Sequence, residues 1–251
     1  MANSLSFNTT DLSDYGLTLA HSDIPGFTQQ STSQLIQDIS YSFQPKRPPK
    51  IINIDVDVMG ATRAILDGYL DDIKFIITHE SAKVLKLDHI TDRYWNTKLE
   101  SFVGYYSSPY HWGGTITFKA DDPMAYDNSA TSSDHAIDSD PDTVVETTGG
   151  TGTILPVYTL TAKEDLGAIT LKLENLTTDE ELQWEGTLNT DSYVTVDVPN
   201  WVVSLDGTVD MADVSGQFPR LAANVANSIK VTALYSSVAG VLNIAYRKRY
   251  L

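Results

Sequence analysis

The residues best suited to binding a metal ion are sparse in this chain of 251 residues. It has no cysteine, and no two of its five histidines are three or four positions apart: His21, His79, His89, His111 and His135. Such scatter argues against a histidine-based metal site. Asp138, Asp140 and Asp142 alternate as the first ligands of a calcium-binding loop do. Thr143 and Gly149 stand where that loop needs a glycine and a bidentate glutamate. We therefore expect no metal and no cofactor.

Carboxylate pairs could serve acid–base catalysis, but the pairs in this sequence are adjacent along the chain. Asp121 precedes Asp122, and Glu180 precedes Glu181. On a strand, neighbouring side chains point to opposite faces of the sheet, so neither pair is placed to act on one substrate. The motifs of nucleophilic hydrolases, phosphate-binding loops and zinc proteases are absent. We therefore expect no enzymatic activity and keep glycan hydrolysis only as a third hypothesis.

Aromatic side chains are the remaining candidates for binding. Four fall in one expected hairpin: Tyr105, Tyr106, Tyr110 and Trp112. They could form a subunit interface, stack on a sugar ring or fill the core, and the pattern favours interface and core equally. Trp184 and Trp201, in the second half of the chain, could hold a sugar weakly or dock a partner, although a place in the core is the simpler interpretation.

The net charge of −16 excludes one class of partner. The net charge, counted from Lys and Arg as positive and from Asp and Glu as negative, is −5 for residues 1–123, −6 for residues 124–150 and −5 for residues 151–251. Such a surface repels nucleic acid, so specific nucleic-acid binding is not expected, and the simplest role of the charge is solubility. No stretch has the length and apolar composition of a signal peptide or a membrane span.

The hydrophobic patterns predict a mainly β chain of two domains. Residues 1–126 form the first, expected to be a β-sandwich or split barrel. Within it, residues 52–58 alternate apolar and polar side chains as a half-buried strand does, whereas residues 61–77 have helical spacing. Residues 153–251 show short apolar runs every 8 to 12 residues, which is typical of an all-β sandwich.

Residues 127–152 are expected to be an exposed, mobile acidic linker. They lack apolar periodicity, carry the −6 segment and end in a glycine cluster. A compact domain rarely contains so long a loop without regular structure, so the segment favours two separate bodies.

Three stretches of the sequence, in this order along the chain, resemble motifs of one protein family. They are residues 5–17 (LSFN then LSDYGL), residues 85–99 followed by 116–126 (ITFKADDPMAY), and residues 216–221 (GQFPRL) followed by 227–231 (NSIKV) and 244–250 (IAYRKRY). Together they resemble the distal tail proteins of siphophages over nearly the whole chain. Met124 departs from the family's usual phenylalanine.

The resemblance implies a homohexameric ring at the virion tail tip or baseplate, assembled in the host cytoplasm. The first domains would surround a channel that lets DNA pass, and a galectin-like C-terminal sandwich would project as a docking platform. Implied partners are the tail tube protein, the tail-tip hub protein, the tape-measure protein and receptor-binding or baseplate proteins. The expected second domain has no histidine, and Trp184 with Glu185 is only a fragment of the galectin sugar-binding set. We therefore expect protein docking, with a carbohydrate-binding module as the alternative.

Overall fold

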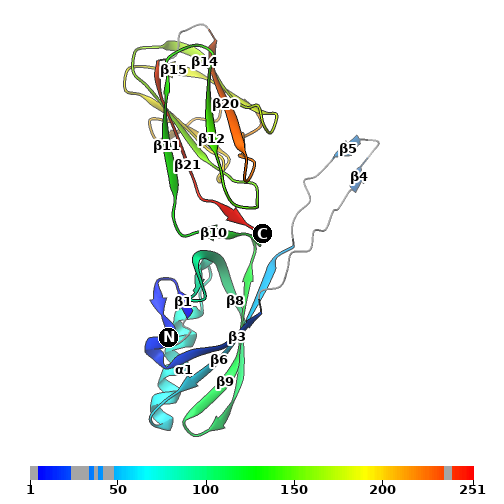
Figure 1. Cartoon of the computed structure of the whole chain (residues 1–251), viewed down its shortest axis with the longest axis vertical. Coiled ribbons are helices and arrows are strands. Elements are labelled where there is room, and N and C mark those ends of the chain that lie inside the picture. Colours follow the sequence, from blue (N-terminus) through cyan, green and yellow to red (C-terminus); the bar gives the residue numbers. More distant parts are fainter. Residues whose placement is uncertain (1–4, 24–33, 37–38, 42–47, 235–238) are drawn as a thin grey trace. The chain divides into compact units, whose positions relative to one another are not determined.

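The computed structural model describes residues 5–23, 34–36, 39–41, 48–234 and 239–251. It divides into two compact units, Met1–Tyr126 together with Leu251, and Asp127–Tyr250 (Figure 1). The expected mainly β fold is confirmed, because strands make up most of both units.

The N-terminal unit is built on a sheet in the order β2-β1-β7-β8-β9-β6-β3. Its strands are β1 (Leu5–Phe7), β2 (Thr10–Asp11), β3 (Leu17–Asp23), β6 (Lys50–Met59), β7 (Lys83–Leu87), β8 (Ile90–Ser108) and β9 (His111–Ala120). A short 3-10 helix, η1 (Leu12–Tyr15), follows β2, and β4 (Gln34–Ile36) pairs with β5 (Ile39–Tyr41). The short strand β10 (Ala125–Asp127) spans the boundary between the two units in the sequence.

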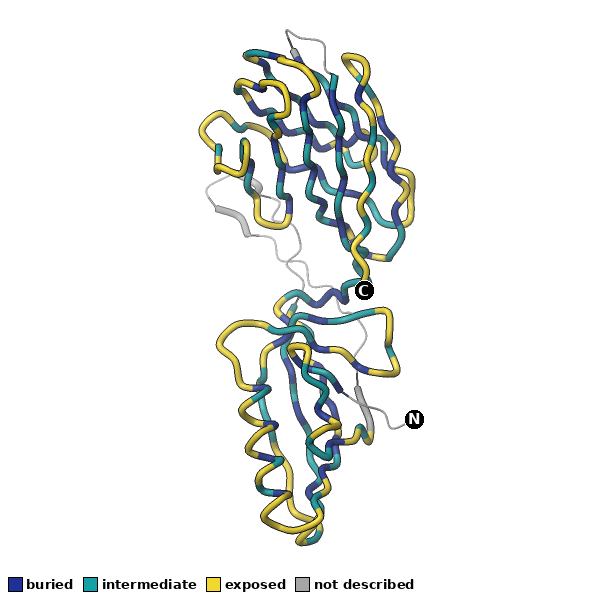
Figure 2. Tube along the Cα trace, turned by 90° about the vertical axis from the view of Figure 1, so that its left-hand side faces the viewer, coloured by how far each residue is buried: buried dark blue, intermediate teal, exposed yellow. Residues whose placement is uncertain are grey.

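One face of this sheet is covered by the helix α1 (Arg63–Ile77), which confirms the helix expected over residues 61–77. Thr62 caps its N-terminus, where the side-chain oxygen accepts from the backbone N–H of Ile65 at 3.2 Å. The buried stripe of α1 consists of Leu66, Leu70, Ile73 and Ile77. On β6, the apolar side chains of the alternating run are buried and the intervening Asn and Asp side chains face the other way. Figure 2 shows this division along α1, whose outer turns are exposed.

The C-terminal unit is a sandwich of two antiparallel sheets. The first has the order β11-β21-β13-β16-β17-β18, and the second the order β12-β20-β14-β15-β19. The strands are β11 (Thr131–Ile137), β12 (Asp142–Thr147), β13 (Val157–Ala162), β14 (Gly167–Asn175), β15 (Glu180–Leu188), β16 (Tyr193–Asp197), β17 (Val202–Leu205), β18 (Thr208–Val209), β19 (Val214–Gly216), β20 (Ala226–Leu234) and β21 (Gly240–Tyr246). The short strand β22 (Arg249–Tyr250) follows and belongs to neither sheet. A continuous core that includes Tyr158, Leu171, Trp184 and Leu242 fills the space between the sheets.

The prediction that residues 127–152 form an exposed acidic linker is wrong. Residues 131–137 pair with β21, and residues 142–147 pair with β20, so each forms the edge strand of one sheet. An edge strand has a single neighbour and buries few side chains; in β11 only Ile137 is buried. Apolar alternation is therefore weak in both segments, and long-range pairing defines them instead.

The acidic side chains of this segment are hydrogen-bond acceptors within the sandwich. Asp140 Oδ1 accepts from the backbone N–H of Ala233 at 3.0 Å, and Asp134 Oδ1 accepts from Asn243 Nδ2 at 2.6 Å. Hydrogen bonds to the backbone of residues 138, 139 and 143 lower the pKa of Asp142, and the bond from Asp138 has the largest effect. The negative charge that suggested a solvated linker is thus used to fix loops and edges.

Candidate functional site

The hairpin of β8 and β9 separates the four expected contact residues into two groups. Tyr105 and Tyr110 are 71% and 57% exposed, whereas Trp112 is only 4% exposed. Trp112 stacks on Phe102, with ring centroids 4.8 Å apart and an interplanar angle of 9°. The structure therefore places Trp112 in the core, and the prediction that it takes part in an exposed interface is wrong.

Two glycines explain why Trp112 can lie so close to the strands. A Cβ atom at Gly104 would lie 2.3 Å from the indole, and one at Gly114 would lie 2.4 Å from it. No other residue fits beside the ring without displacing it. The glycines around Trp112 are the sequence signal that could have predicted its burial.

Tyr106 is partly exposed but already has partners. Its hydroxyl donates to Asp67 Oδ1 at 2.8 Å, and the Arg63 guanidinium carbon lies 3.5 Å from its ring centroid. The hydrogen bond from Tyr106, followed by that from Arg63, lowers the pKa of the Asp67 carboxyl. Tyr106, although 43% exposed, therefore joins the hairpin to α1, and Tyr105 and Tyr110 are the more exposed aromatic side chains of the hairpin.

Sequence reasoning missed a hydrogen-bonded chain at the tip of this hairpin. Ser107 Oγ bonds with His111 Nδ1, and His111 Nε2 lies 2.9 Å from Asp57 Oδ1. A nucleophilic serine hydrolase also joins Ser, His and Asp, but there the serine bonds with Nε2 and the carboxylate is buried. Here the ring nitrogens have the opposite roles and Asp57 is 37% exposed. The chain therefore acts as a cross-strand support for the hairpin.

The two tryptophans of the C-terminal unit also have different environments. Trp184 is fully buried, and its indole N–H donates to Asp210 Oδ2 at 3.1 Å. It cannot stack on a sugar, which confirms the simpler expectation of a core residue. Trp201 is 56% exposed and therefore departs from that expectation.

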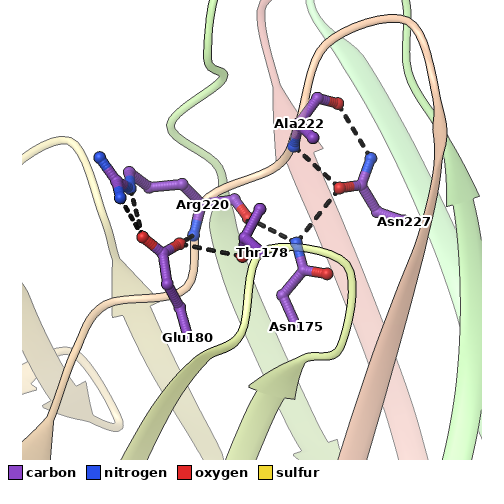
Figure 3. A network of polar contacts seen from close by, with 6 residues as sticks. All are labelled: Asn175, Thr178, Glu180, Arg220, Ala222 and Asn227. Atoms are coloured by element: carbon purple, nitrogen blue, oxygen red, sulfur yellow. Dashed lines mark hydrogen bonds and ion pairs between the residues drawn. The ribbon is translucent and has the colours of Figure 1, made fainter.

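A buried polar cluster includes Arg220, two residues beyond the Phe218 that packs against Trp201, and we call it the Glu180 cluster (Figure 3). Glu180 is 5% exposed, and its carboxylate receives hydrogen bonds from the guanidinium and backbone N–H of Arg220 and from the hydroxyl of Thr178. Asn227 Oδ1 accepts from the backbone N–H of Ala222 at 2.8 Å and from Asn175 Nδ2 at 3.2 Å. The cluster fixes the segment that precedes β20. This segment contains the GQFPRL motif.

A second buried carboxylate closes the edge of the sandwich, and we call its surroundings the Glu146 cluster. Glu146 is 6% exposed and lies within hydrogen-bonding distance of Ser133 Oγ (2.6 Å), Tyr246 Oη (2.9 Å) and His135 Nε2 (3.1 Å). The cluster joins β11 and β21 of one sheet to β12 of the other. It also places His135 in the C-terminal unit, contrary to the expectation that this unit has no histidine.

Tyr158 carries a buried hydroxyl that has no hydrogen-bond partner in the part of the chain that the structure describes. Its ring borders an internal cavity of about 10 Å³ among Leu, Val and Tyr side chains. An unsatisfied buried hydroxyl destabilises the folded state. We therefore expect Tyr158→Phe to leave the fold intact and to raise the free energy of unfolding by about 1 kcal/mol at neutral pH, measured by urea denaturation. A loss of more than about 1 kcal/mol would contradict this assignment.

Because two of its tyrosines are buried, we predict that the sandwich is less stable at alkaline pH. Burial raises the pKa of Tyr158, and burial together with the hydrogen bond to Glu146 raises the pKa of Tyr246 to about 12. Both hydroxyls keep their protons in the folded state at a pH where the unfolded chain releases them. The stabilisation that depends on these two protonated hydroxyls is therefore fully present below about pH 10. Above that pH, the free energy of unfolding falls by about 1.4 kcal/mol per pH unit for each group. Thermal unfolding from pH 8 to pH 11 tests this, and Tyr158→Phe should show a shallower decline.

The described residues contain neither a metal-binding cluster nor a helix able to span a membrane. No group of three or more His, Cys, Asp or Glu side chains is arranged to hold a metal ion there. Of the helices in those residues, none combines the length and the apolar character needed to cross a membrane.

The two units thus define a class: a mainly β protein with a helix-covered sheet followed by a two-sheet sandwich, and with exposed aromatic side chains on both. No protein-family model matches the sequence, and no curated protein matches it significantly. Among solved structures, the chain is similar to the SPP1 Dit (gp 19.1) protein, described as a paradigm of the hub adsorption apparatus in phages that infect Gram-positive bacteria. The likeness covers 100% of both chains, with a TM-score of 0.76 and 14% sequence identity.

Weaker similarities connect the chain to the baseplate of phage P2 in its activated conformation. The form with Ca gives a TM-score of 0.48 at 10% identity, and the form with Sr gives 0.48 at 9% identity, each over 98% of both chains. Of these comparisons, the one with SPP1 Dit is close enough to assign a fold. The chain has the fold of a siphophage distal tail protein, as the sequence resemblance implied.

Proposed function

We propose that this protein is a structural component of a phage tail tip or baseplate. Six copies would form a ring that joins the tail tube to the host-adhesion apparatus and lets DNA pass. The supporting observation is the likeness to SPP1 Dit over the full length of both chains, which includes both units and their order. The tail tube, tail-tip hub, tape-measure and receptor-binding proteins are the partners that this role requires.

The exposed face of the β8–β9 hairpin is the contact surface that we assign to the ring. Val103 and Tyr105 lie two residues apart on β8, so they share a face, and they are 66% and 71% exposed. Tyr110, at the tip, is 57% exposed. Exposed aromatic side chains beside an aliphatic one are typical of interface centres.

The charge of the chain is compatible with a channel for DNA. A net charge of −16 repels the phosphate backbone, so DNA would pass without adhering. This role needs no base-specific contact and no basic surface. The C-terminal sandwich is available for docking other baseplate proteins in the same proposal.

The mass of the protein in solution tests the ring directly. Sedimentation or light scattering should give about six times the 27.6 kDa of one chain, and negative-stain images should show rings. A monomer at all concentrations, together with millimolar or tighter sugar affinity, would favour the alternative of a carbohydrate-binding module instead.

Replacing both exposed tyrosines of the hairpin should weaken the ring. Tyr105→Ala with Tyr110→Ala removes two side chains of the kind that dominate interfaces, so we expect the concentration needed for assembly to rise at least about tenfold. Sedimentation velocity over a dilution series measures this change. The control is Phe75→Ala, which removes an 83% exposed aromatic side chain that belongs to α1 and not to the hairpin. Loss of the ring in the control but not in the tyrosine variant would place the interface on the helix.

A further inference from the structure

Trp201 differs from every other tryptophan in the chain. It is 56% exposed, whereas Trp95, Trp112 and Trp184 are at most 4% exposed. An exposed indole presents a large apolar surface to water, which contributes nothing to folding. Its position in the turn between β16 and β17 therefore calls for another explanation.

The backbone at Trp201 is also unfavourable for its side chain. Its φ angle is +58°, in the left-handed region that costs bulky residues free energy. The other described non-glycine residues with positive φ are mostly Asn and Asp, which tolerate it: Asn8, Thr9, Asp179, Asp191, Asp206 and Asn224. An Asn at position 201 would suit the backbone better. A strained, exposed residue of this kind is characteristic of a functional site.

The indole ring is nevertheless held in place. Phe218 packs against it with ring centroids 5.3 Å apart at an angle of 70°. Phe218 is itself only 8% exposed and lies two residues before Arg220, which the Glu180 cluster fixes. Trp201 is thus supported by a buried network, so little ordering of its side chain would be needed on binding.

Polar groups with a fixed geometry belong to the same turn. Asp197 Oδ1 accepts from the backbone N–H of Asn200 at 3.1 Å, and Oδ2 accepts from Asn200 Nδ2 at 2.8 Å. The carboxylate and the amide are therefore held in one orientation, and each keeps lone pairs for further hydrogen bonds. The turn thus combines an exposed aromatic surface with a fixed carboxylate and amide.

We propose that the turn of residues 197–202 binds a neutral saccharide, with one sugar face stacked on Trp201 and hydroxyl groups donating to Asp197 and Asn200. A pyranose ring combines an apolar face with a polar rim, which matches this arrangement. The turn has no basic residue and the chain carries −16, so an anionic polymer is disfavoured. The site goes beyond the ring function and does not depend on it.

The site also differs from the one expected for a galectin-like domain. Trp184, part of the galectin fragment in the sequence, is fully buried. The Glu180 cluster supports the proposed site only through Phe218, which lies two residues before Arg220 and packs against Trp201.

Ligand-observed saturation-transfer NMR on the full chain tests the proposal. The probes are the methyl glycosides of glucose, galactose, N-acetylglucosamine and rhamnose at millimolar concentration. At least one should show saturation transfer to protons of a single sugar face. Tryptophan emission should change saturably with the same sugar, because Trp201 is the exposed indole.

Variants separate recognition from folding. Trp201→Asn fits the left-handed backbone, so it should unfold at the same temperature as the parent or higher while losing the sugar signal. Asp197→Ala should weaken binding on the order of tenfold. Val209→Ala, at another exposed position, should leave both signals unchanged. No saturation transfer from any of the four sugars, an unchanged signal in Trp201→Asn, or a marked drop in its unfolding temperature would each overturn the proposal.

Discussion

Replacing Glu180 with alanine is expected to destabilise the C-terminal sandwich by about 3–5 kcal/mol, because it leaves a partly buried guanidinium without its counter-ion. Glu180 is 5% exposed and receives hydrogen bonds from the side chain and backbone of Arg220 and from Thr178. The substitution removes the acceptor of all these hydrogen bonds at once. Urea denaturation monitored by the fluorescence of buried Trp184 measures the loss.

The adjacent residue provides a matched control. Glu181 has the same charge, but its side chain is 38% exposed and pairs with Lys172 at 2.7 Å on the surface. An exposed pair contributes little, so Glu181→Ala should cost at most about 1 kcal/mol. Equal effects of the two substitutions would show that Arg220 does not depend on Glu180. The contrast also follows from the strand geometry, since neighbouring residues of β15 face opposite sides.

The second large effect is expected at Glu146. Its carboxylate accepts from Ser133 and Tyr246 and lies 3.1 Å from His135 Nε2, and bonds to a buried charge are worth more than neutral ones. Glu146→Ala should therefore cost about 3 kcal/mol or more, measured by the same denaturation experiment. The edge strands β11 and β12 should also lose hydrogen-exchange protection before the rest of the sandwich.

The control for this prediction comes from the same acidic segment. Asp138 is exposed in the bend between the two strands, and Asp138→Ala should change stability by no more than about 0.5 kcal/mol. If Glu146→Ala were equally mild, residues 127–150 would behave as the solvated linker that their composition suggested. A large loss supports their place in the sandwich.

Hydrophobic periodicity predicted the elements that bury one whole side against the core. The alternation in β6 and the helical stripe of α1 were visible because each buries one side against the core. The edge strands β11 and β12 were missed because they bury few side chains and are specified by partners about a hundred residues away. A scan for periodicity cannot detect such pairing.

The aromatic residues show the same limit. Hydrophobic periodicity alone did not distinguish Trp112 from Tyr105, since both lie in one hairpin. Burial of Trp112 depends on Phe102 and on two glycines that make room for its ring. Trp184 and Trp201 were equally indistinguishable until the sandwich enclosed one and exposed the other.

Sequence by itself determined that this protein is mainly β, acidic and free of cysteine, that residues 61–77 have helical spacing, and that its motifs resemble those of distal tail proteins. These properties depend on composition and on contacts between near neighbours. Only the tertiary structure decided which acids are buried acceptors, which aromatic side chains remain exposed and where the second unit begins. Those outcomes depend on pairing between distant strands, and the free energy of burying a side chain is set by what the whole fold places around it.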